Sequence, residues 1–382
     1  MLLSAGTVVT DSEVLSPGWV ETDGPVVVGV GGGPGRAGRP LDLPASTVVP
    51  GFVDAHVHGG GGGSFDATAA AGVMRGVLHH RAHGTTTTLT SLVTAGLDEL
   101  KASIRLLATL VADGEIAGIH LEGPWLSAGR CGAHDPRLLR HPSAADVDDL
   151  LAAAPGAVRM VTLAPELPGG LDAVAAVVRA GAVAAVGHTD ADHATTVAAI
   201  DAGATMATHL FNAMPGLHHR DPGPVAALLL DPRVTVELIG DGLHLAPAMI
   251  ALVEQVAGTG RIALVTDATA ASGMPDGRFT LGTLAVDVRD GAARVVGTDT
   301  IAGGTATMDA LFRAAVARLG GGHADPGALV RAVRMTSLNP ATALGLGDVG
   351  RLATGCSADL VVLDELLAVQ GVQRRGAWVR SP

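Results

Sequence analysis

The chain has 382 residues, of which 48% are hydrophobic and 2% aromatic, so it can fill the core of one barrel-sized domain with a small appendage. The formal net charge is −12 and Lys and Arg are not clustered, which argues against nucleic acid as a partner because phosphate backbones require grouped cations. The two cysteines are far apart, which excludes a disulfide framework and favours a cytoplasmic protein, and the apolar stretches are too short to cross a membrane.

Short apolar runs separated by turns occupy the first fifty residues and predict β-strands. The runs are LLSAGTVVT and PVVVGV, and a glycine-rich loop at residues 31–40 follows them. The last part of the chain, with GRLATGCSADLVVLD and GAWVR, has the same pattern. We therefore expect residues 1–49 and 346–382 to combine into one small β-sandwich domain built from both chain ends.

Eight apolar, strand-like runs alternate with Ala- and Leu-rich helical stretches between residues 50 and 345. Their spacing of roughly 20–40 residues is that of a βα unit, and near-continuous apolar strands are typical of a buried parallel sheet. Gly84, Gly181 and Gly203 each precede a strand, where glycine can end a helix in the left-handed conformation. The pattern predicts an α/β fold, a (β/α)8 TIM-like barrel at residues 50–345 with a β-hairpin inserted at about 278–298.

Polar residues close six of these runs, at the end where barrel enzymes place their chemistry. His56 and His58 follow the first run and, being two residues apart on extended chain, can face the same metal ion. The other strand ends carry Glu122, His188, His209, His244 and Asp267. A single histidine is more often a core residue than a ligand, but packing alone does not explain so many such groups at one end of a barrel.

Imidazoles and carboxylates without paired thiolates suit a divalent metal, zinc first, with iron, manganese and cobalt as alternatives. Such an ion lowers the pKa of a bound water to about 7, and the resulting hydroxide can attack an acyl carbonyl. Asp267 is placed to take the proton of that water and to pass it to the leaving amine as general base and acid. His244 could stabilise the developing oxyanion.

Over nearly its whole length, the chain resembles the amidohydrolase superfamily and, within it, the N-acetylglucosamine-6-phosphate deacetylases. The resemblance rests on the motifs PGFVDAHVHG, HLEGPWLS, GHTDA, THLFNAM, DGLH and LVTDATAASG. It implies that the metal site generally kept in the family is formed by Glu122, His188 and His209. It also implies a second site from His56 and His58 with Asp267 nearby, bridged through Glu122, and it leaves open whether one or two ions bind.

The only lysine, Lys101, lies in a predicted helix. Many binuclear relatives, such as dihydroorotases and hydantoinases, bridge their metals through a carboxylated lysine on the fourth strand, and the fourth strand here, RMVTLAPE, contains none. A carboxylate from the third strand must then take that place, which favours the deacetylase branch.

The resemblance also implies contacts with a sugar phosphate. Asn212 and Ala213 match main-chain donors to the phosphate, and His134 and His244 match histidines that contact the sugar or the carbonyl. Arg220 matches an arginine that reaches the phosphate held by the neighbouring subunit, which implies a homodimer.

Cys131 departs from the family pattern, in a glycine-rich stretch, AGRCGAHDP, that we interpret as a lid. It either contacts substrate or controls closure of the loop, or it is an incidental small residue.

The expected reaction is hydrolysis of N-acetylglucosamine 6-phosphate to glucosamine 6-phosphate and acetate, in amino-sugar catabolism and cell-wall recycling. One alternative is the deacetylation of another N-acyl amino-sugar phosphate, such as N-acetylgalactosamine 6-phosphate, because the motifs define the chemistry better than the sugar. The other is a non-catalytic scaffold of the same fold, although such proteins usually lose metal ligands and this sequence keeps all of them.

Overall fold

The computed structural model describes residues 1–33, 41–322 and 325–382, so most of the loop predicted at residues 31–40 lies outside the described residues. The chain forms two compact units, which we call the terminal unit and the barrel unit. Their bounds are Met1–Asp54, Leu78–Thr87 and Thr307–Pro382 for the terminal unit, and Ala55–Val77 and Thr88–Ala306 for the barrel unit. Within the described part of the chain, no helix is both long and apolar enough to span a membrane.

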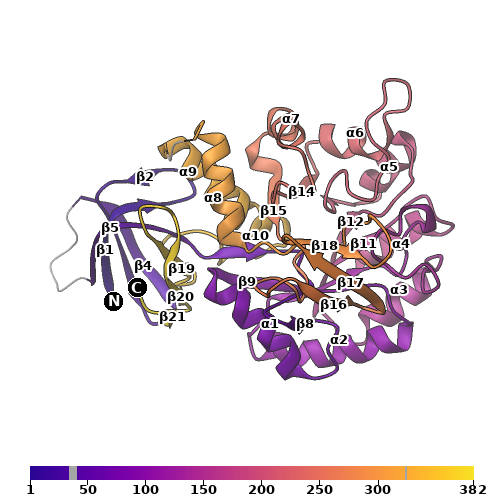
Figure 1. The fold of residues 1–382 in the computed structure, drawn as a ribbon, viewed down its shortest axis with the longest axis horizontal. Helices are drawn as coiled ribbons and strands as arrows, with labels where there is room; N and C mark the ends of the chain where they lie inside the picture. Colours follow the sequence, from indigo (N-terminus) through magenta and orange to yellow (C-terminus); the bar gives the residue numbers. More distant parts are fainter. Residues whose placement is uncertain (34–40, 323–324) are drawn as a thin grey trace. The chain divides into compact units, whose positions relative to one another are not determined.

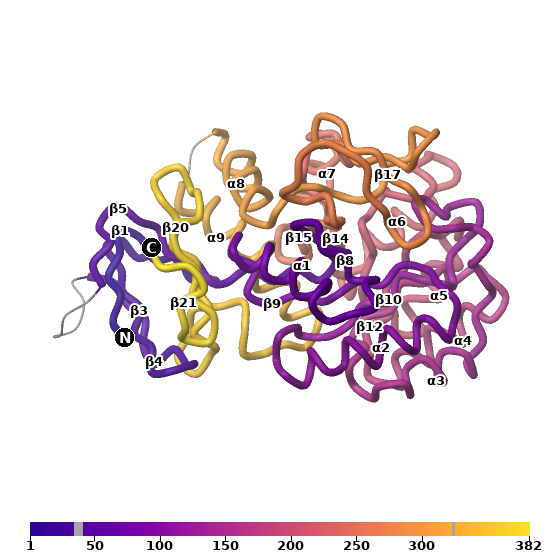
Figure 2. Tube along the Cα trace, turned by 60° about the horizontal axis from the view of Figure 1, so that its bottom comes forward, coloured from indigo at the N-terminus to yellow at the C-terminus, as the bar shows by residue number. Residues whose placement is uncertain are grey.

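Strands from both ends of the chain form one eight-stranded sheet in the terminal unit (Figure 1). The strands are β1 (Leu2–Val9), β2 (Val14–Leu15), β3 (Gly18–Asp23), β4 (Val26–Gly32), β5 (Leu41–Pro50), β19 (Leu360–Leu363), β20 (Val369–Arg374) and β21 (Ala377–Arg380). Their order is β21-β20-β19-β5-β1-β3-β4, with β2 paired to β1. Strand β5 runs parallel to β1 and antiparallel to β19. Strands from the two chain ends therefore lie side by side in one sheet, as predicted (Figure 2).

The terminal sheet curls until its β4 edge meets the segment before β19. The N–H of Val27 donates to the carbonyl of Cys356 at 2.8 Å, and the N–H of Ala358 donates to the carbonyl of Pro25 at 2.7 Å. Side chains that alternate along the strands, such as Leu3 and Ala5 on β1, then point inward and form a buried apolar core.

The second sheet is parallel, with the order β15-β14-β13-β12-β11-β10-β9-β6. Its strands are β6 (Phe52–Asp54), β9 (Thr85–Leu92), β10 (Gly118–Glu122), β11 (Val158–Leu163), β12 (Val183–Val186), β13 (Met206–Ala207), β14 (Thr235–Ile239) and β15 (Ile262–Val265). The segments that follow its two outermost strands bond to each other, because the N–H of Asp267 donates to the carbonyl of His56 at 2.9 Å and that of His58 donates to Ala268 at 2.8 Å. This nearly closed barrel confirms the predicted α/β fold.

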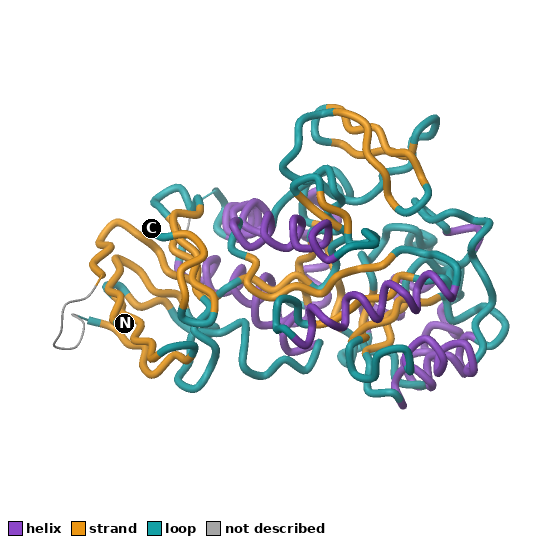
Figure 3. The backbone as a smooth tube through the Cα atoms, turned by 90° about the horizontal axis from the view of Figure 1, so that it is seen from below, coloured by secondary structure: helices purple, strands orange, loops and turns teal. Residues whose placement is uncertain are grey.

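Helices connect successive strands of the barrel (Figure 3). They are α1 (Ala70–Ala82), α2 (Leu97–Ala112), α3 (Ala144–Leu151), α4 (Gly170–Arg179), α5 (His193–Asp201), α6 (Gly223–Leu230) and α7 (Pro247–Ala257). Side-chain caps stabilise the first turn of some of these helices. At α5, for example, the side chain of Asp192 accepts a hydrogen bond from the backbone N–H of Thr195 at 2.7 Å. The glycines expected before strands have φ values of 90° at Gly84, 80° at Gly181 and 109° at Gly203, so their left-handed conformation is confirmed.

Two short strands, three helical turns and three further helices complete the described part of the chain. They are β7 (Gly59–Gly60), β8 (Gly63–Ser64), the helical turns η1 (Ala128–Arg130), η2 (Thr259–Arg261) and η3 (Arg334–Leu338), and α8 (Met308–Leu319), α9 (Pro326–Val333) and α10 (Asn339–Ala343). An antiparallel sheet follows β15 in the chain and consists of β16 (Gly277–Leu281), β17 (Leu284–Arg289) and β18 (Ala292–Val295). Its buried side chains, among them Leu281 and Val286, pack with Val93 and Ala271 in one apolar cluster.

Candidate metal centre

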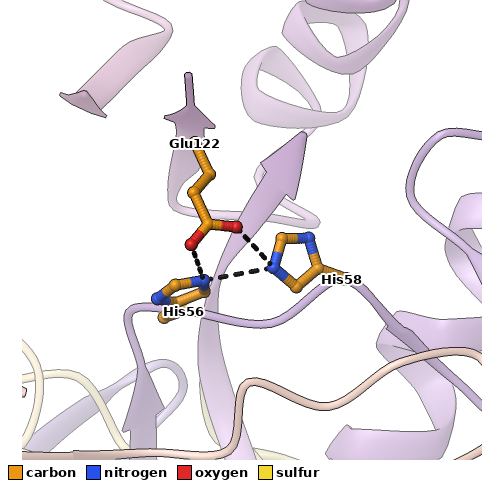
Figure 4. Close-up of side chains that lie close together, drawn as sticks. All are labelled: His56, His58 and Glu122. Atoms are coloured by element: carbon orange, nitrogen blue, oxygen red, sulfur yellow. Dashed lines mark hydrogen bonds and ion pairs between the residues drawn. The ribbon is translucent and has the colours of Figure 1, made fainter. Parts of the chain in front are cut away.

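The carboxylate of Glu122, at the end of β10, lies at the centre of a group of histidines in the barrel unit. Figure 4 shows two of them, His56 and His58, whose Nε2 atoms lie 3.5 Å from Oε1 and 3.2 Å from Oε2 of Glu122. The two Nε2 atoms lie 3.1 Å apart. Oδ1 of Asp267 faces both, at 3.4 Å from His56 and 3.2 Å from His58. We call His56, His58 and Asp267, together with the carboxylate of Glu122, the HxH half-site.

Two further histidines contact the same glutamate. Nε2 of His188 and Nε2 of His209 lie 3.1 Å and 3.0 Å from Oε1 of Glu122, and 3.1 Å from each other. We call these two histidines with Oε1 of Glu122 the His188 half-site. The residues that the sequence placed on separate strands are thus brought together around one shared carboxylate.

The hydrogen bonds behind the rings indicate which nitrogens are free to bind a metal. Nδ1 of His58 faces the carbonyl of Ser91 at 3.2 Å, and Nδ1 of His188 faces the carbonyl of Arg130 at 2.8 Å. A carbonyl can only accept, so Nδ1 carries the proton in both neutral rings and Nε2 keeps its lone pair. Several lone pairs and carboxylate oxygens therefore face one another, and a divalent cation fits this set of N and O donors.

His134 differs from the other histidines around Glu122, although its Nε2 lies 3.2 Å from Oε2 of the glutamate. Its Nδ1 accepts a hydrogen bond from the backbone N–H of Thr94 at 3.2 Å. The proton of the neutral ring is therefore on Nε2 and points at Glu122. Although His134, His188 and Glu122 are close enough to hold an ion together, this tautomer makes His134 a hydrogen-bond donor rather than a ligand.

The charges of the cluster support the same interpretation. Burial lowers the pKa of His58, but hydrogen bonds and charge from Asp267 and Glu122 outweigh it and raise that pKa to about 9. For Asp267, burial raises the pKa, but the nearby histidines, led by His56, hold it well below its usual range. Without a metal, protons must neutralise the facing carboxylates, and a metal ion would take over that role.

Three residues of the cluster occupy strained backbone conformations just after their strands. The φ values are 48° at His188, 29° at His209 and 48° at Asp267. Left-handed conformations cost residues with a side chain about 1–3 kcal/mol each and concentrate at functional sites. The turn after β13 continues this pattern, with φ of 79° at Phe211 and 52° at Ala213.

A cavity of about 350 Å³ opens onto the cluster. Among its lining residues are His58, Glu122, His134, His188, His209, Asn212, Ala213, His244 and Asp267. His244 is held by Asp241, whose Oδ2 lies 2.8 Å from Nδ1 of the ring and whose Oδ1 accepts from the backbone N–H of His244 at 3.0 Å. Burial lowers the pKa of His244, but this carboxylate outweighs it and raises the pKa.

Two expected substrate contacts are not on this cavity wall. Arg130 and Gly132 line the cavity, whereas Cys131 between them is not among the described lining residues. Arg220 is exposed and its Nη1 lies 2.6 Å from Nε2 of His219, so its guanidinium does not join the cluster of its own chain.

Sequence reasoning missed several residues that hold the ligands in place. Arg130 and Ser91 orient His188 and His58 through main-chain carbonyls, for which a sequence carries no residue-specific signal. Glu237 contacts His56 from within β14. The sequence signal for this contact is the charged residue inside the strand TVELI, which lies in the middle of the strand rather than at its end.

Comparison with known proteins gives consistent results. The profile of the amidohydrolase family matches residues 47–379. An N-acetylgalactosamine-6-phosphate deacetylase of Escherichia coli O157:H7 is 37% identical over 337 residues, covering 87% of each chain. An N-acetylglucosamine-6-phosphate deacetylase of Danio rerio is 38% identical over 366 residues, covering 90% of this chain and 87% of that protein.

Solved structures extend the comparison. A mutant N-acetyl-D-glucosamine-6-phosphate deacetylase from Mycobacterium smegmatis, in complex with N-acetyl-D-glucosamine-6-phosphate, is 55% identical with a TM-score of 0.97, covering 100% of this chain and 99% of that one. The N-acetylglucosamine-6-phosphate deacetylase from Thermotoga maritima is 30% identical with a TM-score of 0.88, and the match covers 100% of both chains.

Proposed function

The chain belongs to the amidohydrolase family, and on this premise we propose that it hydrolyses N-acetylglucosamine 6-phosphate to glucosamine 6-phosphate and acetate. The observation that carries the proposal is the shared carboxylate of Glu122, which joins two histidine half-sites at the floor of a cavity. The 55% identity to an enzyme that was solved with this sugar phosphate supports the choice of substrate. The proposal places the protein in the cytoplasm, in amino-sugar catabolism and cell-wall recycling.

In this proposal the His188 half-site holds one divalent ion and the HxH half-site can hold a second, with zinc as the first expectation and iron, manganese or cobalt as alternatives. When bound, such an ion would polarise the acetyl carbonyl and lower the pKa of a water to about 7. Glu122 is the ligand that both half-sites would share, because its carboxylate lies beside His58 through Oε2 and beside His188 and His209 through Oε1.

Asp267 serves as general base and then general acid. Its carboxylate is ionised at neutral pH, because the histidines beside it outweigh burial and hold its pKa below the usual range. It lines the cavity, so its carboxylate can accept a proton from the attacking water and return it to the amine as the C–N bond breaks.

Two histidines act on the acyl group and the sugar. His244 is backed by Asp241, which favours its charged form and fits it to stabilise a developing oxyanion. His134 presents a proton on Nε2 toward the centre and can hold a substrate oxygen in position. His244 can do so while it keeps its hydrogen bonds to Asp241, whereas the Nε2 proton of His134 has to turn from Glu122 to the substrate.

The phosphate is bound by the turn after β13 together with a second copy of the chain. Asn212 and Ala213 line the cavity, and the left-handed φ of 52° at Ala213 sets the direction of the main chain there. Among the described lining residues, Arg130 is the only Lys or Arg. We propose that Arg220, exposed in its own chain, supplies a cation to the site of the neighbouring subunit in a homodimer.

N-acetylgalactosamine 6-phosphate is the second candidate substrate, favoured by the 37% identity to an enzyme named for that sugar. A panel of both sugar phosphates and of unphosphorylated N-acetylglucosamine, assayed for acetate release by zinc-loaded protein, distinguishes them. We expect the highest kcat/KM with N-acetylglucosamine 6-phosphate. Failure to release acetate from either phosphate, with cleavage of a different amide, would overturn the proposal.

A further inference from the structure

Glu237 is a fully buried carboxylate inside the barrel, on β14. A single oxygen, Oε2, lies 3.2 Å from Nδ1 of His56 and also accepts from the backbone N–H of His209 at 3.2 Å. The other oxygen, Oε1, is buried without a hydrogen-bond partner among the described residues. A half-satisfied buried carboxylate is costly, so packing alone would favour an apolar residue here.

The two contacts of Oε2 reach different halves of the metal centre. His56 belongs to the HxH half-site, and a carboxylate at Nδ1 fixes the proton there and directs the Nε2 lone pair toward the metal position. His209 belongs to the His188 half-site and needs its turn held at φ 29°. The main-chain carbonyl of Glu237 adds a second hold on this turn, because it accepts from the N–H of Leu210 at 2.9 Å.

We propose that Glu237 is a positioning residue that couples the two half-sites, so that the HxH half-site binds its metal with full affinity only while this carboxylate is present. The inference rests on the metal ligands of the proposed function, but not on which sugar is cleaved. Glu237 is not among the described residues that line the cavity, and it acts through His56 and the His209 turn.

Metal content measures this role without any substrate. Wild type, Glu237→Leu, Glu237→Gln and His56→Ala are stripped with a chelator, equilibrated with buffered zinc, and analysed for bound equivalents. We expect two equivalents in wild type, one in His56→Ala, and a loss of about 10–100-fold in affinity for the second equivalent in Glu237→Leu. Glu237→Gln keeps an oxygen that can accept both hydrogen bonds, so it should bind the second ion more tightly than Glu237→Leu.

Thr162→Val is the matched control, because Thr162 is fully buried in the same barrel and bonds to His120 and Thr208 rather than to a ligand. It should keep both equivalents, and the absorption bands of its cobalt form should match those of wild type. A wild type that holds one equivalent at saturation, or a Glu237→Leu protein that binds both with unchanged affinity, overturns the inference. If Glu237→Leu loses metal but the wild-type protein cleaves no amino-sugar phosphate, the inference about Glu237 still holds. Only the proposed function would then be overturned.

Discussion

The two half-sites around Glu122 are built by different means. His56 and His58 lie two residues apart on one segment, so their proximity follows from extended chain alone. His188 and His209 come from two strands, and each ring is aimed by a left-handed residue just after its strand. The HxH half-site is therefore local in sequence, whereas the His188 half-site exists only when the barrel has folded. Glu122 and Glu237 each contact both half-sites. Substitutions of the metal-ligand residues test whether the two half-sites differ in this way.

The largest effect should follow the loss of the shared carboxylate. In Glu122→Ala both half-sites lose an oxygen ligand, so we expect kcat/KM to fall about 10⁴-fold, because a metal contributes several kcal/mol to the transition state. Steady-state kinetics and metal analysis on the same preparation measure both losses. Glu99→Ala, at an exposed position on α2, is the control and should match wild type. A Glu122→Ala enzyme that keeps its metal would remove Glu122 from the centre.

Asp267→Asn should separate proton transfer from metal binding. We expect kcat to fall by about 10³-fold while KM changes little, because the amide cannot accept the proton of the attacking water. The His188 half-site does not include Asp267, so at least one metal equivalent should remain. If the variant retained wild-type kcat at neutral pH, another residue would have to be the base.

We also expect the two half-sites to contribute unequally to kcat/KM. His209→Ala should lower kcat/KM by about 10³-fold, and His56→Ala by about 10–100-fold with the loss of one metal equivalent. Metal analysis alongside kinetics checks both values. Equal losses of kcat/KM in the two variants would mean that catalysis requires both half-sites to be occupied together.

The smallest expected effect concerns His244 and pH. Its pKa in the folded protein is raised above 6.5 by Asp241, so the pair stabilises the fold fully below pH 6.5 and loses this contribution as pH rises through the folded pKa. Asp241→Asn should therefore reduce the free energy of unfolding by on the order of 1–2 kcal/mol at pH 6 and by less above that pKa. Denaturant unfolding at pH 6 and pH 9 measures the difference. A constant difference at both values would show that His244 does not titrate in this range.

The sequence sufficed where a residue's role is set by its place in a strand. Alternating apolar runs predicted the barrel, and the ends of those runs predicted that His56, His58 and Glu122 lie together. The sequence could not predict that Nδ1 of His134 accepts a hydrogen bond, because the donor is the backbone of Thr94, 40 residues away. Whether His134 is a ligand or a donor depends on that contact.

Glu237 was missed for a different reason. Its side chain lies in the middle of a strand, where a glutamate has no chemistry until the ring of His56, 181 residues away, is packed against it. The boundaries at residues 49–50 and 345–346, the substrate contact of Cys131 and the reach of Arg220 into a second subunit stay predictions. Each depends on a partner group or a boundary that the single folded chain does not define.

We propose that this centre hydrolyses the acetamide of N-acetylglucosamine 6-phosphate only with metal bound. The most direct measurement is acetate release from that substrate while zinc is added back, in known equivalents, to chelator-stripped protein. We expect no release without metal and a rise with each added equivalent until the metal sites around Glu122 are filled. Acetate release at the full rate from stripped protein, or none at any zinc content, would contradict it.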